Sequence, residues 1–184
     1  MIILASASPR RQQLMSLICD SFTVEPADID ETVETGIDVE KIPEYLAEKK
    51  AEHIFNNGHF DDIVIGCDTG VFINSQMLGK PRSEDEAVKM LSALSGKKHK
   101  VITGCAVICR EKRLEFSQKT EVEFYELTQD EILDYIKTGE PMDKAGAYGI
   151  QGMGAKLVKG INGDFFNVVG LPVALLSRKL NELK

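Results

Sequence analysis

Two short apolar runs constrain the fold more than any other feature of this sequence. Residues 63–67 read Ile-Val-Ile-Gly-Cys without polar alternation, and residues 2–4 read Ile-Ile-Leu. Runs of this length are too short for a helix, and a continuous apolar run is typical of a strand that is buried on both faces. Strands of this kind need helices packed on their sheet, so the sequence predicts an α/β fold.

Helical periodicity and capping signals place the covering helices. Apolar residues recur at intervals of three and four positions, and capping boxes open two segments at residues 83–86 and 128–131. The predicted helices span residues 9–18, 39–55, 83–95, 128–136 and 172–183. In the first of them, four apolar residues are expected to face the core: Leu14, Met15, Leu17 and Ile18.

The remaining β-rich segments complete the expected sheet. They cover residues 22–25, 100–109, 114–126 and 156–159. The second and third of these flank Glu111-Lys112 and are expected to form a long hairpin. A glycine-rich polar loop is expected over residues 139–154. The predicted architecture is therefore a mixed, twisted β-sheet with helices packed on it.

Composition excludes several classes of protein. The chain has 184 residues, which predicts one domain over residues 1–184, and its net charge of −7 argues against binding to a nucleic-acid backbone. No apolar run approaches the roughly 18 residues of a membrane span, and the first residues lack the basic region of a secretory signal. The cysteines form no CxxC or Cys/His metal pattern, so buried free thiols are expected. We therefore expect a cytoplasmic protein without nucleic-acid or membrane partners.

A first candidate site lies where the strand at residues 2–4 leads into a helix. Ser8 suits the N-cap and Pro9 the first turn, and the exposed backbone N–H groups at such a helix start attract anions. Arg10 and Arg11 add guanidinium groups that match phosphate oxygens. The alternative is a capped surface helix with solvated arginines. Basic residues in a first turn oppose the helix dipole, which favours a bound anion that offsets them.

Acidic residues form a second group of candidates. Asp68 and Thr69 directly follow the apolar run at residues 63–67, and ligands of open α/β sheets gather beyond the carboxyl ends of strands. Asp68 is therefore a candidate general base or metal ligand, and Thr69 offers a hydroxyl. The alternative is an aspartate that only caps a turn. The acidic segment 28–31 would suit a divalent cation if it lay close to Asp68, although most such segments are solvated loops.

The segment at residues 140–152 is the third candidate. It interleaves glycines with acidic, basic, aromatic and amide side chains, which is more than a tight turn requires. Gln151 carries a donor and an acceptor and is suited to read the edge of a nucleobase. Lys50 and Lys80 are further cations, although isolated lysines are more often surface charges. Together, the candidates are what a nucleoside triphosphate hydrolase needs.

At these residues the sequence resembles the Maf family of nucleoside triphosphate pyrophosphatases. The resemblance covers nearly the whole chain in the order of the family, at residues 4–11, 68–69, 79–81, 95–96, 103–104, 139–152 and 167–172. The Tyr-Gly-Ile-Gln-Gly run at residues 148–152 is similar to the branch that acts on dTTP and UTP, rather than to the branch that acts on 7-methyl-GTP. Gly70 departs from the pattern, because family members more often carry a larger apolar residue there.

The resemblance implies a fold and an activity. The fold is that of Maf and ITPase-like proteins, with a substrate cleft between two lobes. The activity is hydrolysis of dTTP, UTP and modified pyrimidine triphosphates between the α and β phosphates, with Mg²⁺ or Mn²⁺ as the cofactor. A homodimer is also implied. The alternative is a nucleotide-binding regulatory protein that acts on septum formation in cell division through a partner.

The resemblance also implies residue roles by matching position. Asp68 would be the proton acceptor that activates water, or a metal ligand together with Glu31. The positions associated with substrate choice are Arg10, Thr69 and Gln151. Further polar residues match those that line the cleft of the family: Ser8, Arg11, Glu31, Lys50 and Lys80.

Overall fold

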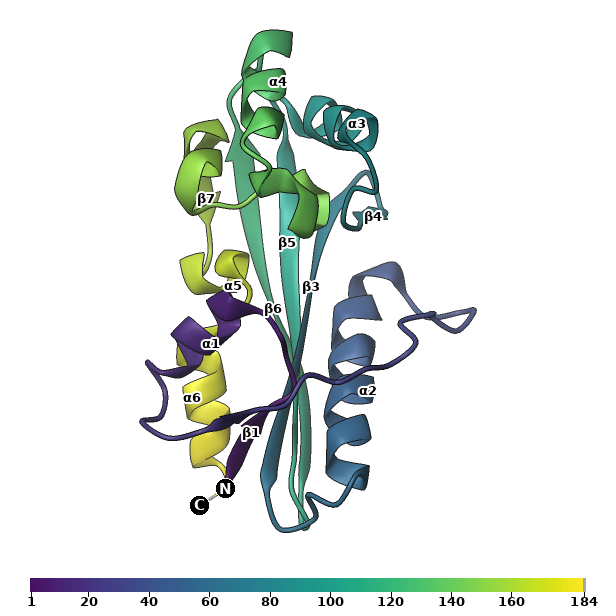
Figure 1. The fold of residues 1–184 in the computed structure, drawn as a ribbon, viewed down its shortest axis with the longest axis vertical. Coiled ribbons are helices and arrows are strands. Elements are labelled where there is room, and N and C mark those ends of the chain that lie inside the picture. The colour runs from purple at the N-terminus through teal and green to yellow at the C-terminus, as the bar shows by residue number, and fades with distance from the viewer. Residues whose placement is uncertain (184) are drawn as a thin grey trace. The chain divides into compact units, whose positions relative to one another are not determined.

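A computed structural model describes residues 1–183 of the chain. Over these residues the strands form one mixed sheet of seven strands (Figure 1). The strands are β1 (Ile2–Leu4), β2 (Thr23–Val24), β3 (Ile63–Ile73), β4 (Gln76–Leu78), β5 (Lys98–Ile108), β6 (Arg113–Phe124) and β7 (Val158–Asn162). Their order is β2-β1-β3-β5-β6-β7, and β4 pairs with β3 outside this path.

Helices of two kinds connect these strands. The α-helices are α1 (Pro9–Met15), α2 (Ile42–Asn56), α3 (Glu84–Leu94), α4 (Gln129–Lys137), α5 (Phe165–Val169) and α6 (Val173–Asn181). The short 3₁₀ helices are η1 (Val39–Lys41), η2 (Glu140–Asp143), η3 (Ala145–Ala147) and η4 (Gly152–Leu157). No helix among the described residues is long and apolar enough to cross a membrane.

Strand directions confirm the predicted mixed sheet. β1 pairs in parallel with β2 and with β3, whereas the β3–β4 and β6–β7 pairs are antiparallel. The hairpin of β5 and β6 is also confirmed, since Cys109 and Lys112 exchange backbone hydrogen bonds across its turn. Parallel pairing thus joins β1 to its two neighbours, and antiparallel pairing adds β4 to β3 and β7 to β6.

The chain divides into two compact units. Unit 1 comprises residues 1–69, 103–118 and 170–184, and unit 2 comprises residues 70–102 and 119–169. The divisions fall inside β3, β5 and β6, so each of these strands contributes to both units. The single domain over residues 1–184 stays a prediction.

In unit 1, helix α2 lies directly on the strands. Its face towards them is built from Ala47, Ala51 and Ile54. These residues pack against the strand residues Ile3, Val64, Ala106 and Ile108 and against Ala5, which follows β1. A Cβ atom added at Gly66 would overlap the carbonyl oxygen of Ala47, and one added at Gly104 would overlap the backbone of Pro43 and Glu44. These glycines, on the neighbouring strands β3 and β5, therefore let the α2 backbone approach the sheet more closely than any other residue would.

The opposite face of the strands in unit 1 is covered as well. Because successive strand residues point to opposite faces, Leu4 and Ile65 face away from α2. Both are completely buried, as are Met15 of α1 and Leu176 of α6. Figure 1 places α1 and α6 on the side of β1 and β3 opposite to α2. The apolar run at residues 63–67 is thus buried on both faces, which confirms the prediction.

Unit 2 has a core of its own. Apolar residues of α3 and α4 pack against the strand residues Val71, Val101, Val122 and Phe124. Ser83 caps α3 by accepting a hydrogen bond from the Glu86 N–H. At α4, the Thr128 hydroxyl accepts from the Glu131 N–H while the Glu131 carboxylate accepts from the Thr128 N–H, which is a complete capping box. The sequence signals for both helices are confirmed.

The first helix is shorter than the sequence predicts. It ends at Met15, and Leu17, which was expected to face the core, is 63% exposed. The Leu17 and Ile18 N–H groups bond to the carbonyls of Leu14 and Met15, three residues back. This tighter turning ends the α-helix and rotates Leu17 outwards.

Other elements lack a strong sequence signal. Asn74 and Ser75 both have positive φ, of 50° and 62°, and form a two-residue turn that pairs β3 with β4. The sequence lacks the Asn-Gly or Asp-Gly pair that usually marks such turns, so β4 was not predicted. Helix α5 is only five residues long and was not predicted either. The expected loop at residues 139–154 contains η2 and η3 and the start of η4.

Candidate active site

Asp68 lies inside a strand, and the prediction that it directly follows one is wrong. Strand β3 continues to Ile73, because its apolar residues resume at Val71 and pair with β4. The neighbouring strand β1 ends at Leu4 and pairs only with residues 63–65 of β3. Asp68 therefore lies beyond the carboxyl end of β1, where ligands of α/β sheets gather, although it does not lie at the end of its own strand.

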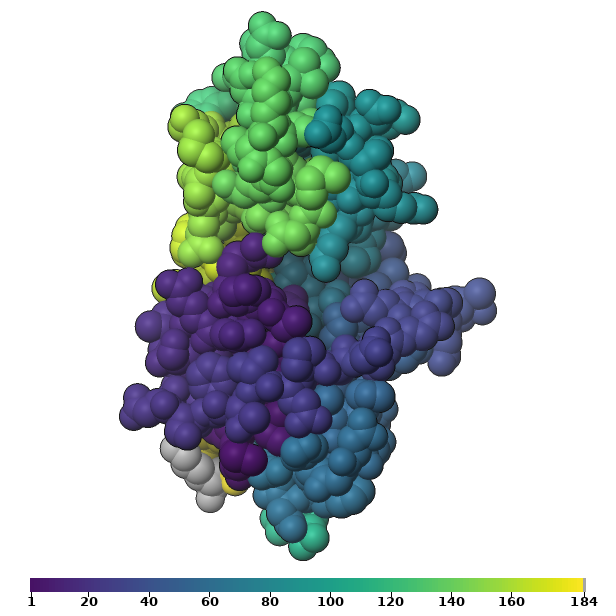
Figure 2. All heavy atoms as spheres, viewed as in Figure 1, coloured from purple at the N-terminus to yellow at the C-terminus, as the bar shows by residue number. Residues whose placement is uncertain are grey.

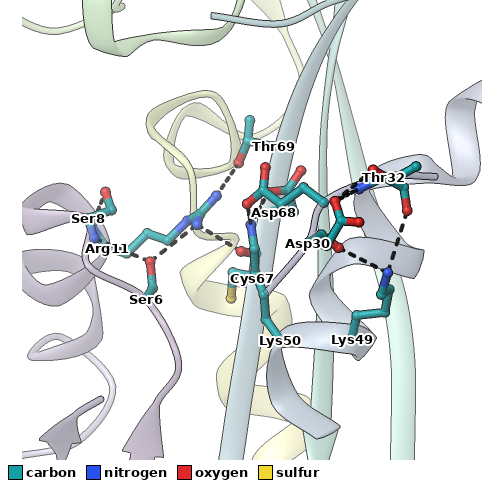
Figure 3. A network of polar contacts seen from close by, with 11 residues as sticks. Ser6, Ser8, Arg11, Asp30, Thr32, Lys49, Lys50, Cys67, Asp68 and Thr69 are labelled. Atoms are coloured by element: carbon teal, nitrogen blue, oxygen red, sulfur yellow. Dashed lines mark hydrogen bonds and ion pairs between the residues drawn. The ribbon is translucent and has the colours of Figure 1, made fainter. Parts of the chain in front are cut away.

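Lys50 of α2 links two carboxylates. Its ammonium nitrogen lies 2.6 Å from Asp68 Oδ1 and 2.8 Å from Glu31 Oε1. The side chains of Lys50 and Asp68 are 11% and 14% exposed, so their charges interact with less screening than a surface pair. Figure 3 shows Lys50 rising from α2 towards Asp68 on β3. The structure thus brings together three residues that were predicted separately.

The segment that carries Glu31 is fastened to the same helix. Lys49 donates hydrogen bonds to the carbonyl oxygens of Asp30 and Thr32, at 3.1 and 3.5 Å. Asp30 accepts from the hydroxyl and the N–H of Thr32, and these hydrogen bonds lower the pKa of Asp30. Figure 2 shows this segment on the surface beside α2. Consecutive lysines of α2 therefore hold the backbone of the segment and the carboxylate of Glu31.

Arg11 forms a clamp at the start of α1. Its Nε donates to the carbonyl oxygen of Gly170 (2.9 Å), and its Nη1 donates to Cys67 O (2.8 Å) and Ser6 Oγ (3.3 Å). Its Nη2 donates to Thr69 Oγ1 at 3.0 Å. The planar guanidinium thereby joins α1, β3 and the segment before α6 within unit 1. These bonds fix the backbone before Asp68 and the hydroxyl after it (Figure 3).

Ser8 and Arg10 complete the start of α1. Ser8 has extended backbone dihedrals, and its hydroxyl accepts from the Arg11 N–H, so the predicted N-cap is confirmed. Arg10 is partly exposed and interacts with other residues of the protein. There is no acidic residue in the first turn of α1 to match the helix dipole.

Thr69 is held from two sides. Besides the bond from Arg11, its hydroxyl lies 2.9 Å from the hydroxyl of Thr103 on β5. Gly70, the next residue, departs from the family pattern, and the space a side chain would occupy there is filled. A Cβ atom at Gly70 would lie 2.8 Å from the Phe72 ring and 2.9 Å from the Met77 methyl group. Within unit 2, the side chains of Phe72 and Met77 therefore fill the space that a larger residue at position 70 would occupy.

Lys80 and Gln151 belong to unit 2. Lys80 follows β4 and is exposed, and Gln151 is exposed at the residue before η4. The flanking residues Tyr148 and Ile150 are buried. The other predicted site residues lie in unit 1, where Lys50 contacts both Glu31 and Asp68. A role for Lys80 and Gln151 at the same site stays a prediction.

Two acidic residues of the site are candidate ligands of a hard cation. Among the described residues, no three His, Cys, Asp or Glu side chains form a metal-binding group. However, Asp68 and Glu31 present carboxylate oxygens to one shared cation, Lys50. Mg²⁺ commonly uses one or two carboxylates and completes its coordination with substrate phosphates and water. The donor set of Asp68 and Glu31 fits a divalent cation of this kind.

Two buried thiols lie behind Asp68. Cys67 Sγ and Cys105 Sγ are 3.6 Å apart on β3 and β5, and both cysteines are reduced. Burial raises the pKa of Cys105, which keeps this thiol protonated. The prediction of buried free thiols is confirmed for this pair, while Cys19 and Cys109 are only partly buried.

Sequence reasoning missed two supporting residues. Lys49 and Thr103 hold site residues in place, but each is a common residue type with no local signal. Thr103 lies in a segment of family resemblance, and this was the only pointer to it. The contacts depend on how α1, α2 and β5 pack around β3, which a linear pattern does not encode.

Solved structures identify the class of fold. A HAM1 protein from Coxiella burnetii aligns with a TM-score of 0.59 at 18% identity, over 98% of both chains. The Ham1 protein of Staphylococcus aureus aligns with a TM-score of 0.56 at 16% identity, over 100% of this chain and 99% of that one. The chain is therefore an α/β protein with the fold of Ham1 proteins, as the resemblance implied.

The family follows from the sequence comparisons. Residues 1–183 match the family described as Maf-like protein. A relative from Bacillus cereus is 48% identical over 181 residues, which cover 98% of this chain and 94% of the relative. A relative from Geobacillus sp. is 48% identical over 183 residues, covering 100% of this chain and 96% of the relative. Both are named dTTP/UTP pyrophosphatase. The chain belongs to the Maf-like protein family, which confirms the resemblance.

Proposed function

We propose that this protein is a pyrophosphatase that hydrolyses dTTP and UTP, including modified pyrimidine triphosphates, to the nucleoside monophosphate and pyrophosphate. The names of relatives that are 48% identical over nearly the full chain support this activity. The observation that carries it is the Lys50 ammonium between Asp68 and Glu31, where β1 ends beside β3. A cation and two carboxylates at such a position suit a reaction on a polyphosphate.

Asp68 is proposed as the proton acceptor. The oxygen of a water molecule attacks the α phosphorus, and the bond from this phosphorus to the oxygen that bridges to the β phosphate breaks. The displaced pyrophosphate carries away the bonding electrons, and a proton of the water passes to the Asp68 carboxylate. Lys50 holds Asp68 Oδ1 at 2.6 Å, which fixes the orientation of the carboxylate.

A divalent cation, Mg²⁺ or Mn²⁺, would be held by Asp68 and Glu31. When bound, it would neutralise phosphate charge and make the attacking water more acidic. Arg11 supports this region from the other side of β3 by fixing the Cys67 carbonyl and the Thr69 hydroxyl. Its role in the proposal is to keep the strand rigid around Asp68.

Arg10, Thr69 and Gln151 are proposed to select the base and sugar, and Ser8 and Lys80 to bind phosphates. Uracil and thymine differ by one methyl group, which typically changes rates only about 10- to 200-fold. An amide that hydrogen-bonds to the shared edge of both bases therefore explains acceptance of UTP and dTTP together. Purines are larger, and cytosine presents a different donor and acceptor pattern.

The test is a panel of nucleoside triphosphates with Mg²⁺ or Mn²⁺, with all products separated by chromatography. We expect UMP or dTMP with pyrophosphate, and no turnover in chelator or with Asp68→Asn. Asp20→Asn, an exposed aspartate in a bend, is the matched control and should keep full activity. Nucleoside diphosphate with orthophosphate would show that a different bond is cleaved. Nucleotide binding without turnover would favour the alternative, a regulatory protein of cell division.

A homodimer and a cytoplasmic location belong to the same proposal. Sedimentation velocity tests the dimer, and a single species with the 20.4 kDa mass of the chain would contradict it. Cell fractionation tests the location. Binding to nucleic acid is not expected at a net charge of −7, and a salt-dependent gel shift would contradict this expectation.

A further inference from the structure

The carboxylate of Glu140 organises the glycine-rich segment that carries Gln151. Glu140 Oε2 accepts a hydrogen bond from the Met153 N–H at 2.9 Å, and Oε1 accepts one from the Gly154 N–H at 3.2 Å. Both donors lie after Gln151 in the chain. A side chain at the start of η2 thus fixes the backbone at the start of η4, and all of these residues belong to unit 2.

Tyr135 extends this contact to the other side of Gln151. Its hydroxyl donates to Glu140 Oε1 at 2.9 Å and accepts from the Gly149 N–H at 3.1 Å. Tyr135 is 5% exposed and part of the core of unit 2, and burial raises the pKa of its hydroxyl, which therefore stays protonated as a donor. The backbone before and after Gln151 is consequently tied to one Glu140–Tyr135 pair.

The glycines of the segment fit this arrangement closely. A Cβ atom at Gly152 would lie 2.7 Å from Glu140 Oε2, and one at Gly154 would lie 2.6 Å from the Tyr135 hydroxyl. Gly152 also has a φ of 66°, which other residues rarely adopt. The chain can therefore wrap around Glu140 and Tyr135 only with glycine at these positions.

Gln151 itself is left available for a ligand. It is exposed, and it makes no side-chain capping bond to η4. Among the described residues, its side-chain amide has no hydrogen-bond partner, whereas the backbone on both sides is anchored. An exposed amide on a fixed backbone is what recognition of a base edge requires, since the ordering cost is met before binding.

We infer that Glu140, together with Tyr135, is a positioning residue for base recognition, which holds the Gln151 amide in place for a uracil or thymine edge. The inference rests on the proposed function for its substrate and on unit 2 alone for its geometry. Glu140 acts through the backbone of residues 149–154 and does not itself contact the base.

The inference can be tested by replacing one carboxylate oxygen of Glu140 with an NH₂ group. Burial opposes the charge of Glu140, but the hydrogen bonds from Met153, Tyr135 and Gly154 outweigh it and lower the pKa of Glu140. All three donors need an acceptor. In Glu140→Gln an NH₂ group replaces one oxygen and faces at least one of these donors without a bond. The side chain keeps its size, so the packing is preserved.

The experiment compares Glu140→Gln with the wild type on UTP, dTTP and CTP. We expect the KM for UTP and dTTP to rise about tenfold, with kcat changed less than about threefold, so that the preference over CTP decreases. Glu126→Gln, an exposed glutamate in unit 2, is the matched control and should leave all values unchanged. An equal loss of kcat on every nucleotide would indicate a merely structural role and overturn the inference.

A double-mutant cycle with Gln151→Ala tests whether the two residues act as a unit. If Glu140 acts through Gln151, then Glu140→Gln adds little to Gln151→Ala, whereas independent effects would multiply and overturn the inference. Tyr135→Phe is the second variant if Glu140→Gln does not fold, and the same cycle applies to it. It removes the bond to Glu140 and leaves the Gly149 N–H without its acceptor.

Amide hydrogen exchange separates this inference from the proposed function. In Glu140→Gln, the amides of Gly149, Met153 and Gly154 should exchange at least about tenfold faster, while the amides of α3 stay unchanged. Unchanged exchange at these three amides would overturn the inference whatever the activity. If the wild type hydrolyses neither dTTP nor UTP, the proposed function is overturned, and with it the inference that Gln151 recognises uracil or thymine. The exchange result would still decide whether Glu140 fixes the backbone on both sides of Gln151.

Discussion

The buried histidine of unit 2 predicts a loss of stability in mild acid. His99 is 3% exposed, and its ring packs edge-on against the rings of Phe124 and Tyr148, with centroids 4.9 and 5.4 Å away. Its Nε2 lies 2.7 Å from the Tyr148 hydroxyl, and its Nδ1 has no hydrogen-bond partner among the described residues. Burial lowers the pKa of His99 from 6.5 to about 4, although the backbone of Lys97 opposes the shift.

The magnitude follows from the linkage between protonation and folding. In the unfolded chain His99 takes up a proton below about pH 6.5, whereas in the folded protein it stays neutral until about pH 4. Stability that is present above pH 6.5 is therefore lost as the pH falls through this window. At about 1.4 kcal/mol per pH unit, the full loss is about 3 kcal/mol, of which about 2 kcal/mol is reached at pH 5.

The assay is urea denaturation of the wild type and His99→Phe at pH 7.5 and pH 5.0. Phenylalanine keeps a ring in the cluster but cannot take up a proton. We expect the wild type to lose about 2 kcal/mol more free energy of unfolding between the two pH values than the variant does. Other groups titrate equally in both proteins, so the difference isolates His99. Equal losses in the two proteins would refute the reasoning.

Two further predictions concern unit 1, both measured by urea denaturation. Gly66→Ala should lower the free energy of unfolding by about 3 kcal/mol or more, because the added Cβ atom overlaps the Ala47 carbonyl oxygen. Gly160→Ala is the control: there is open space around Gly160, so the free energy of unfolding should change by less than about 0.5 kcal/mol. Arg11→Lys should cost about 2 kcal/mol, since a lysine cannot reach its four acceptors at once, and should lower kcat/KM through Thr69. Arg82→Lys, on an exposed arginine, is its control, and equal effects of the two lysine substitutions would contradict the clamp.

The sequence predicts the secondary structure of this protein where periodicity is strong. The continuous apolar run at residues 63–67 indicated a strand covered on both faces, and the capping residue Thr128 indicated a helix start. These signals are local, because they depend only on which side chains of the segment are buried and on how its own backbone N–H groups are hydrogen-bonded. The length of β3 was not predictable in this way, since polar Asp68 and Thr69 interrupt the apolar run while the strand continues.

The sequence indicates candidate site residues but not how they are arranged. Asp68 was singled out by its place after the apolar run and Lys50 as a candidate cation, yet their 2.6 Å contact depends on how closely α2 approaches β3. Arg11 was expected to bind phosphate, whereas the structure shows its guanidinium bonded to four protein oxygens. Glu140 had no signal beyond its place in the glycine-rich segment, because two of its partners are backbone N–H groups, which nearly every residue carries, and the third is the hydroxyl of Tyr135 on α4.

The glycines beneath α2, Gly66 and Gly104, limit which sequence changes leave Lys50 in contact with Asp68. Because Gly66 and Gly104 bring backbone against backbone at two points, the distance from Lys50 to Asp68 depends on these glycines and on the small side chains of Ala47 and Ala51 beside them. A one-residue insertion in α2 ahead of Lys50, by contrast, would rotate this lysine by about 100° around the helix axis and separate it from Asp68. The sequence of α2 ahead of Lys50 is therefore constrained in its length as well as in the size of its side chains.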